Sequence, residues 1–235
     1  MHSLLSLPER YRALVIGASG AIGGAIAEQL RADPRCAAVC TLARDTVPRI
    51  DFSAPDSIAE AAQALHSQGP WQLIVVATGM LQGTTGGPEK RLADLRAEHL
   101  AASFAINAIG PALALAHFTP QLARGQRCLF AVLSAKVGSI GDNRLGGWYS
   151  YRAAKAALNM LLKTAAIELA RTHPQAVLAA LHPGTVDSAL SAPFRGAQIG
   201  RPAQHAARDL LAVLDGLQAE DSGGLWAYDG QRLPW

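Results

Sequence analysis

A tyrosine and a lysine, Tyr151 and Lys155, stand four residues apart in an alanine-rich stretch that predicts a helix. Side chains at positions i and i+4 of a helix share one face, so we expect the phenol and the ammonium to lie side by side. A lysine cation stabilises a phenolate and would lower a tyrosine pKa from its usual value of about 10. The pair therefore predicts a proton donor and acceptor that works near neutral pH.

A glycine-rich segment, residues 14–30 (LVIGASGAIGGAIAEQL), indicates where a cofactor for such chemistry would bind. Its apolar start is typical of a buried parallel strand, and the apolar residues that recur every four positions afterwards predict a helix. In between, Gly17, Gly20, Gly23 and Gly24 permit a tight turn, where bare backbone N–H groups and the helix dipole favour an anion. We interpret the segment as the pyrophosphate site of a dinucleotide, and an ordinary flexible turn is the alternative.

Two further polar residues follow predicted strands. Arg44 follows the second one, where a guanidinium would pair with a ribose 2′-phosphate and a carboxylate with a 2′-hydroxyl. It therefore favours NADP over NAD, and a solvated loop arginine beside Asp45 is the alternative. At the end of the third predicted strand, Asp51, with Phe52 next to it, could accept a hydrogen bond from an adenine amino group or could cap a turn.

Small residues follow the fourth predicted strand, and an unusual helical segment comes next. Ala77, Thr78 and Gly79 are small enough to let a cofactor pass close to the backbone. The helical segment 92–121 carries Asn107 and a Gly-Pro pair in its middle, where Gly costs about 1 kcal/mol and Pro about 3 kcal/mol. We expect a kink that turns the Asn107 amide away from solvent, or else a plain kink between two shorter helices. His99 in this segment is interpreted as structural.

Short apolar runs alternate with Ala/Leu-rich helical stretches along the whole chain, which predicts successive βαβ units. The expected strands are residues 13–17, 37–42, 49–52, 72–77, 127–134, 177–182 and 225–228. With right-handed helical crossovers they give an α/β fold, a single-domain Rossmann fold over residues 1–235. We expect a doubly wound, seven-stranded parallel sheet with helices on both faces. Ligands of such sheets bind beyond the carboxyl ends of the strands.

Composition narrows the function further. The net charge of +3 comes from scattered arginines in 235 residues, without the basic run expected of a nucleic-acid binder. The apolar start is too short for a secretory signal, and no apolar run approaches the roughly 20 residues of a membrane span, so we expect a cytoplasmic protein. The three cysteines, Cys36, Cys40 and Cys128, lack metal-ligand spacing and are interpreted as reduced thiols.

The order of these features resembles the short-chain dehydrogenase/reductase (SDR) family over essentially the whole chain. That family has a T-G-x-x-x-G-x-G turn after its first strand, N-N-A-G after its fourth, a catalytic Asn, a Ser, a Y-x-x-x-K and a P-G-x-V-x-T after its sixth. The counterparts here are Ile16-Gly17-Ala18-Ser19-Gly20-Ala21-Ile22-Gly23, Val76-Ala77-Thr78-Gly79, Asn107, Ser134, Tyr151 with Lys155, and Pro183-Gly184-Thr185-Val186-Asp187-Ser188. Residues 134–159 and the ending YDGQRLPW resemble the C-factor-like or Sniffer-like carbonyl reductases.

Some positions depart from the family pattern. Ala21 stands where the second motif glycine is expected, and Ala77-Thr78 replaces Asn-Ala. Ser188 for Thr keeps a hydroxyl. Ala135 matters more, because many relatives have two serines in a row here and the second usually takes the catalytic role.

The resemblance implies an NADP-dependent oxidoreductase that reduces a carbonyl or oxidises an alcohol, without a metal. In that reaction Tyr151 donates the proton, while Lys155 binds the nicotinamide ribose and lowers the tyrosine pKa. Asn107 anchors a water, and a serine polarises the carbonyl. The turn from Pro183 to Ser188 would surround the carboxamide of the nicotinamide. The alanine- and leucine-rich faces of the helices near 101–121 and 153–171 exceed what one sheet face can cover, so we expect a homodimer or homotetramer. The family resemblance implies the same.

The choice of serine stays open. Ser134 ends a strand at the ligand-binding edge of the sheet and is favoured over Ser139. Because strand side chains alternate, Ser134 and Ala135 should face opposite ways unless the strand is distorted there, so we expect a bulge.

The substrate is not named by the sequence, and two functions are carried forward. We expect substrate specificity in residues 138–148 and 189–202, the second a mobile lid that includes Arg195. The leading function is the reductase of a ketone, aldehyde or quinone. The alternative is a regulatory protein of the same fold that binds NADP without turning over a substrate.

Overall fold

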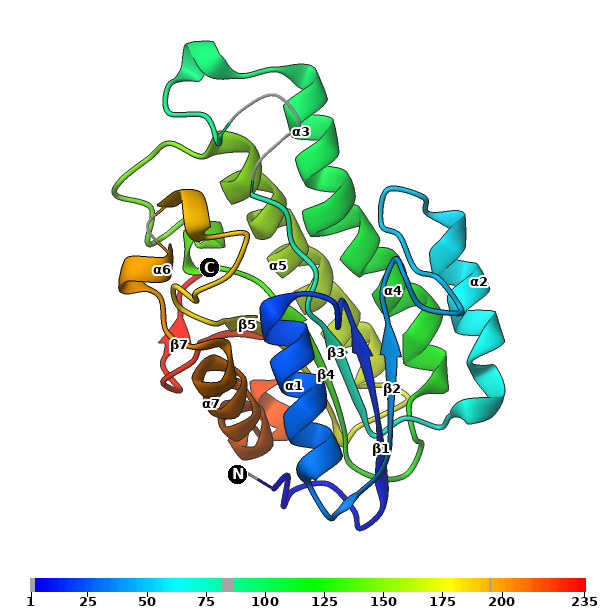
Figure 1. The fold of residues 1–235 in the computed structure, drawn as a ribbon. Coiled ribbons are helices and arrows are strands. Elements are labelled where there is room, and N and C mark those ends of the chain that lie inside the picture. Colours follow the sequence, from blue (N-terminus) through cyan, green and yellow to red (C-terminus); the bar gives the residue numbers. More distant parts are fainter. Residues whose placement is uncertain (1–2, 82–86, 195) are drawn as a thin grey trace.

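All the strands of the described chain join one sheet, in the order β2-β1-β3-β4-β5-β6-β7 (Figure 1). The computed structural model describes residues 3–81, 87–194 and 196–235. Its strands are β1 (Tyr11–Ile16), β2 (Cys36–Leu42), β3 (Leu73–Val76), β4 (Cys128–Leu133), β5 (Ala176–His182), β6 (Gly224–Ala227) and β7 (Arg232–Leu233). Neighbouring strands from β2 to β6 pair in parallel, and β7 pairs with β6 in the antiparallel direction.

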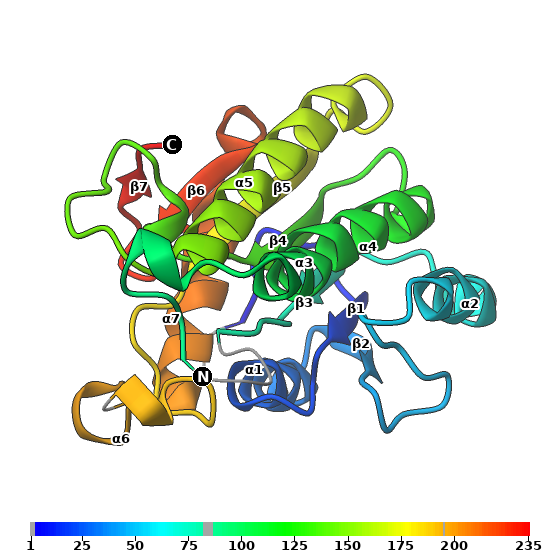
Figure 2. The same ribbon diagram turned by 90° about the horizontal axis from the view of Figure 1, so that it is seen from above.

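Helices cover both faces of this sheet, as the view in Figure 2 shows. The helices are α1 (Ala21–Ala32), α2 (Asp56–Ala64), α3 (Ala97–Phe104), α4 (Gly110–Phe118), α5 (Tyr149–Leu169), α6 (Gly196–Ile199) and α7 (Ala203–Gly216). The pair α1 and α7 packs on one face, and α4 and α5 pack on the other (Figure 2). The doubly wound arrangement expected from the sequence is confirmed.

The side chains of the strands alternate between two hydrophobic cores, one on each face. In β1, Leu14 and Ile16 join the core under α2, α4 and α5, whereas Ala13 and Val15 join the core under α1 and α7. The central strands have no solvated face, so their residues are apolar without interruption. Buried strands of this kind hold their carboxyl ends rigidly at one edge of the sheet.

Two details of the sheet differ from the expectation. Residues 49–52 form a loop and add no strand beside β2, which is therefore the edge of the sheet. Pro48 has no N–H to donate to a ladder, and Ile50 N instead donates 3.0 Å to the carbonyl oxygen of Ala43. The seventh strand is β7, an antiparallel edge strand of the kind that mixed sheets often carry.

A π-helical turn, Ala105–Ile109, lies between α3 and α4 in the segment 92–121 where a kink was expected. Such turns insert one residue into a helix and often mark functional sites. The helical stretch Ala97–Gln121 is long and apolar enough to cross a membrane by length and composition, with 39% of its most apolar window buried. The expectation that no apolar run approaches the length of a membrane span is therefore wrong by length and composition. Its buried face packs on α5 and α2.

Candidate active site

The turn between β1 and α1 requires its glycines. Gly17 has φ of 90°, and a Cβ there would lie 3.0 Å from the carbonyl oxygen of Ala77. A Cβ on Gly23 would lie 2.3 Å from the carbonyl oxygen of Gly17. The strand and the helix therefore approach each other more closely than any side chain permits. Gly20 is the N-cap of α1, and neither a capping side chain nor an acidic residue in the first turn occupies that helix end.

One cavity of about 470 Å³, called the inner cavity below, opens beyond the carboxyl ends of β1, β3, β4 and β5. Residues predicted from the sequence make up most of its wall: Ser19, Gly20, Ala21, Ile22, Arg44, Ala77, Thr78, Gly79, Ser134, Tyr151, Lys155, Pro183 and Ser188. Segments far apart in the sequence meet here because parallel strands end at the same edge of the sheet.

Tyr151 and Lys155 lie in the first two turns of α5. The Lys155 Nζ atom is 5.9 Å from the centroid of the Tyr151 ring and donates a 2.8 Å hydrogen bond to the carbonyl oxygen of Leu133. Burial lowers the pKa of Lys155 to about 7 and raises the pKa of Tyr151 to about 12. The predicted proximity of the Tyr151 and Lys155 side chains is therefore confirmed. The predicted lowering of the tyrosine pKa is wrong, because removal from water outweighs the influence of an ammonium beside the ring.

Asn107 lies in the π-helical turn and is fully buried. Its Oδ1 accepts a 3.0 Å hydrogen bond from Met80 N, and its Nδ2 donates to Met80 O at 2.7 Å and to Ser103 Oγ at 3.2 Å. The amide is turned away from solvent, as expected. It braces the backbone of Met80, which lines the inner cavity, and does not line that cavity itself.

The two candidate serines have different surroundings. Ser134 lines the inner cavity, and its Oγ donates a 2.7 Å hydrogen bond to Asn159 Oδ1. Ser139 is buried away from that cavity and accepts a 3.1 Å hydrogen bond from Asp142 N. The expected bulge is absent, because β4 pairs with β5 in continuous register and Ala135 is extended. Ser134 reaches the cavity because the cavity lies beyond the strand end, where Leu133 lines it too.

The turn after β5 is packed against Tyr228 and bonded to Arg201. A Cβ on Gly184, whose φ is 74°, would lie 2.8 Å from the Tyr228 ring. The carbonyl oxygen of Thr185 accepts a 2.9 Å hydrogen bond from Arg201 N, and Val186 is buried and forms an isolated bridge with Arg201. Only the ends of the turn, Pro183 and Ser188, face the inner cavity.

The residues predicted to hold the adenosine part divide into two groups. Arg44 is exposed and lines the inner cavity, and among the described residues it has no hydrogen bond or ion pair. Asp51 instead accepts from Ser53 N at 3.0 Å and pairs with Arg49 at 2.6 Å, so it caps a turn. The Phe52 ring belongs to the core, where Gly110 leaves room for it.

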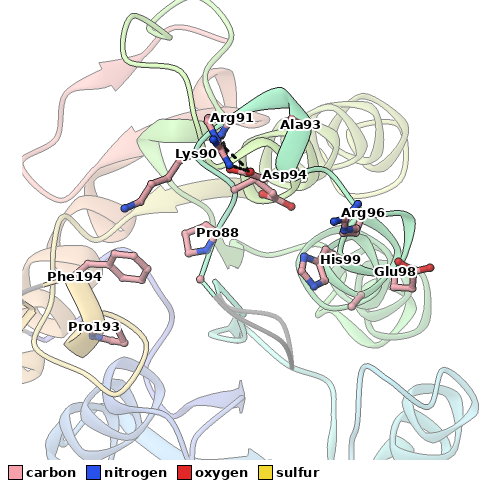
Figure 3. Close-up of a pocket in the computed structure, with 13 residues that line it drawn as sticks. Pro88, Lys90, Arg91, Ala93, Asp94, Arg96, Glu98, His99, Pro193 and Phe194 are labelled. Carbon is pink, nitrogen blue, oxygen red and sulfur yellow. Dashed lines mark hydrogen bonds and ion pairs between the residues drawn. The ribbon is translucent and has the colours of Figure 1, made fainter.

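Two adjoining spaces lead away from the inner cavity. A pocket of about 20 Å³ is lined by Met80, Leu81, Gly87, Pro88, Glu89, His99, Ser103, Ser150 and Tyr151. An outer cavity of about 1080 Å³ shares Gly87, Pro88, Glu89 and His99 with that pocket. Figure 3 shows Phe194 and Pro193 on one side of the outer cavity, and Arg96, the N-cap of α3, with Glu98 and His99 of α3 on the other. Phe194 belongs to the stretch 189–202 expected to set specificity, in which Arg195 lies outside the described residues.

Several lining residues were not anticipated individually. They are apolar or come from loops without a motif: Met80, Leu81, Leu133, Ala189 and Leu190. Ala189 and Leu190 fall inside the stretch 189–202. For Met80 and Leu81, the only signal was their position directly after a strand end.

The family model for short chain dehydrogenases matches residues 11–198. The chain is 30% identical to the 1-hydroxy-2-glutathionyl-2-methyl-3-butene dehydrogenase of Rhodococcus sp. (strain AD45), over 94% of this chain and 98% of that protein. It is 35% identical to the C-signal protein of Myxococcus xanthus, over 61% of this chain and 83% of that one.

Solved structures share the fold. The carbonyl reductase Sniffer of D. melanogaster superposes with a TM-score of 0.80 at 20% identity, over 97% of this chain and 100% of that one. The NADPH-bound carbonyl reductase from chicken fatty liver gives a TM-score of 0.80 at 22% identity over the same shares. The family match, the full-length relative and the fold agree, and the chain therefore belongs to the short-chain dehydrogenase family and is an NAD(P)-dependent dehydrogenase or reductase.

Proposed function

We propose that this protein is an NADP-dependent reductase of ketones, aldehydes or quinones, with Tyr151 as the proton donor. One observation carries the proposal: Tyr151, the buried Lys155 and the glycine turn before α1 line the same cavity. A proton donor thus lies next to a site suited to a dinucleotide. The names of the solved neighbours support the same substrate class and cofactor, since they include a carbonyl reductase with bound NADPH and a putative short-chain dehydrogenase/reductase with bound NADP.

The residues present fit NADP. The glycine turn leaves backbone and an uncapped helix end open toward an anion. Arg44 offers a 2′-phosphate a guanidinium that has no partner in the described part of the chain. The Thr78 hydroxyl is buried and has no partner among the described residues, although Thr78 lines the inner cavity. A buried hydroxyl without a partner is uncommon, and a bound ribose would supply one.

The chemistry follows from where these side chains lie. NADPH, when bound, would supply the hydride that reduces the carbonyl carbon. As the carbon–oxygen π bond breaks, Tyr151 gives its hydroxyl proton to the oxygen, and the product is an alcohol. The Lys155 ammonium stabilises the phenolate that remains, and the Ser134 hydroxyl donates to the carbonyl oxygen. Asn107 acts indirectly, because its amide holds the Met80 backbone at the cavity wall.

A panel assay tests this function. Purified protein with NADPH is offered aldehydes, ketones and quinones, and oxidation of NADPH is followed for each. We expect turnover with at least one class. The reverse assay uses NADP and alcohols, including thioether alcohols, since the Rhodococcus relative is named a dehydrogenase of a hydroxy compound with a glutathionyl group.

A second function is favoured by one finding, the 35% identity to the C-signal protein. Under this alternative the chain binds NADP and signals its occupancy without turnover. Tight NADPH binding without oxidation of NADPH by any compound of the panel would support the signalling function and contradict the reductase.

We also propose that the protein is a cytoplasmic homodimer or homotetramer. The cysteines Cys36, Cys40 and Cys128 are free thiols, as a reducing compartment requires. Large apolar side chains remain exposed along the helices near 101–121 and 153–171: Ile109 (48%), Met160 (68%), Leu161 (42%) and Ile167 (56%). An apolar surface of this kind usually marks an interface.

A further inference from the structure

Glu89 is a buried carboxylate outside the predicted machinery, and both its backbone and its side chain bind the start of α5. The residue is 5% exposed. Its Oε2 accepts a 3.2 Å hydrogen bond from Ser150 N, and its Oε1 accepts one from Ser150 Oγ. Its carbonyl oxygen accepts a 2.5 Å hydrogen bond from Trp148 N.

The start of α5 needs such a partner. The first turn of a helix leaves backbone N–H groups unpaired, and a neighbouring side-chain oxygen normally accepts from one of them. Trp148, the N-cap residue, makes no such bond and lies in the left-handed region with φ of 52° and ψ of 43°, where a bulky residue is strained. Glu89 supplies the missing acceptor from 61 residues away in the sequence, with the negative charge that a helix N-terminus favours.

The residues that Glu89 holds surround the proposed proton donor. Tyr151 directly follows Ser150, and its ring centroid is 6.4 Å from that of Trp148. Glu89, Ser150 and Tyr151 line the same small pocket, together with Met80 and Ser103, the two residues that Asn107 contacts. A shift of the first turn of α5 would therefore move the Tyr151 hydroxyl relative to the wall that Asn107 braces.

We propose that Glu89 is a positioning residue, which replaces the N-cap of α5 and thereby fixes Tyr151 in the geometry for proton transfer. This inference rests on the proposed role of Tyr151 as the proton donor. Burial alone would raise the pKa of Glu89, but the hydrogen bonds from Ser150 outweigh burial and the net pKa is lowered, so the residue accepts as a carboxylate.

The test separates turnover from cofactor binding. We expect Glu89→Ala to lower kcat by roughly tenfold to hundredfold, because misplacement by about 1 Å costs rates of that order. The Kd for NADPH, measured by its fluorescence, should change less than about threefold, since Glu89 does not line the inner cavity. Glu89→Gln should recover most of kcat, because the amide oxygen can accept from Ser150 N while the amide nitrogen donates to Ser150 Oγ. A matched control is Glu168→Ala, which removes an exposed carboxylate from the far end of the same helix.

The outcomes distinguish this inference from the proposed function. If Glu89→Ala keeps kcat within about twofold while Tyr151→Phe is inactive, the inference is wrong and the reductase stands. If Tyr151→Phe keeps at least half of kcat, both are wrong. Should Glu89→Ala fail to fold by circular dichroism, Ser150→Ala removes one of the three hydrogen bonds more gently. The positioning role is wrong if Ser150→Ala has an unchanged kcat and Glu89→Gln loses as much kcat as is expected of Glu89→Ala.

Discussion

The Ser134 hydroxyl donates a 2.7 Å hydrogen bond to Asn159 Oδ1, which joins the carboxyl end of β4 to the middle of α5. A serine has a single O–H donor, so this bond must open before Ser134 can donate to a substrate oxygen. Asn159 also donates to the carbonyl oxygen of Gly138 at 3.4 Å, in the loop that leads to Ser139. The same asparagine thus holds both segments that carry the candidate serines.

We predict that Ser134→Ala lowers kcat by about 10² to 10³, the usual cost of one donor to a developing oxyanion, with little change in cofactor affinity. Ser139→Ala should be near normal, because Ser139 lies away from the inner cavity. The two variants are compared by steady-state kinetics with saturating NADPH. A large loss in Ser139→Ala beside a normal Ser134→Ala would transfer the role to Ser139.

Tyr151→Phe should abolish turnover and leave NADPH binding nearly intact, because only the proton donor is removed. General acid catalysis is worth about 10² to 10⁴ in rate. Single-turnover assays and NADPH fluorescence titration measure the two quantities. A variant with half of the parent kcat would rule out Tyr151 as the proton donor.

Arg44 should give the protein a preference for NADPH, and Arg44→Asp should reverse it by exchanging a phosphate partner for a ribose hydroxyl partner. Charge-assisted pairs contribute about 1.5 to 3 kcal/mol, which is tenfold or more in Kd. Titrations with NADH and NADPH test this. Equal affinities of the parent for both cofactors would contradict it.

The pKa of Lys155 predicts how activity depends on pH. Burial lowers it to about 7, so the ammonium that stabilises the Tyr151 phenolate is lost as pH rises above that value. The kcat/KM for NADPH in carbonyl reduction, which reports the free enzyme, should fall by about tenfold per pH unit above pH 7. Lys155→Met should be slow and nearly independent of pH in this range.

Stability should change in the opposite direction. Between pH 7 and the ordinary lysine value of 10.5, the unfolded chain holds a proton that folded Lys155 has released. The contribution of this residue to the free energy of unfolding therefore rises with pH across that window. If activity falls above pH 7 while the helical circular dichroism signal is kept, the loss comes from titration of Lys155 and not from unfolding. A flat activity profile from pH 6 to 9 would contradict the role of the Lys155 ammonium.

Sedimentation at micromolar concentration should show a dimer or tetramer of the 24.6 kDa chain. Met160→Glu and Ile167→Glu place charges on the exposed face of α5 and should shift the equilibrium toward monomer. Val47→Glu is the matched control, since Val47 is a fully exposed apolar residue in a loop elsewhere. A parent protein that sediments as a monomer would contradict the proposal.

Features encoded by local patterns could be predicted from the sequence. The glycines of the first turn and the spacing of Tyr151 and Lys155 specify their geometry within a few residues, and the structure places both as expected. The loop at 49–52 could not be distinguished from a strand by its short run of residues. Its backbone bonds locally instead, since Ile50 N donates to the carbonyl oxygen of Ala43 and no strand forms beyond β2. Long-range contacts carry no local signal. Glu89 was therefore missed, since its partner Ser150 is 61 residues away.

Trp148 gives the site an optical reporter of its own. Its indole ring centroid lies 6.4 Å from that of Tyr151 and 5.2 Å from that of Phe194. Indole emission responds to the polarity of its surroundings and to quenching groups nearby, so its intensity and colour change when either neighbour moves. The difference in emission between the protein and its Trp148→Phe variant isolates this signal from that of the other tryptophans. The segment around Phe194 can thus be followed in real time during turnover, without an attached dye.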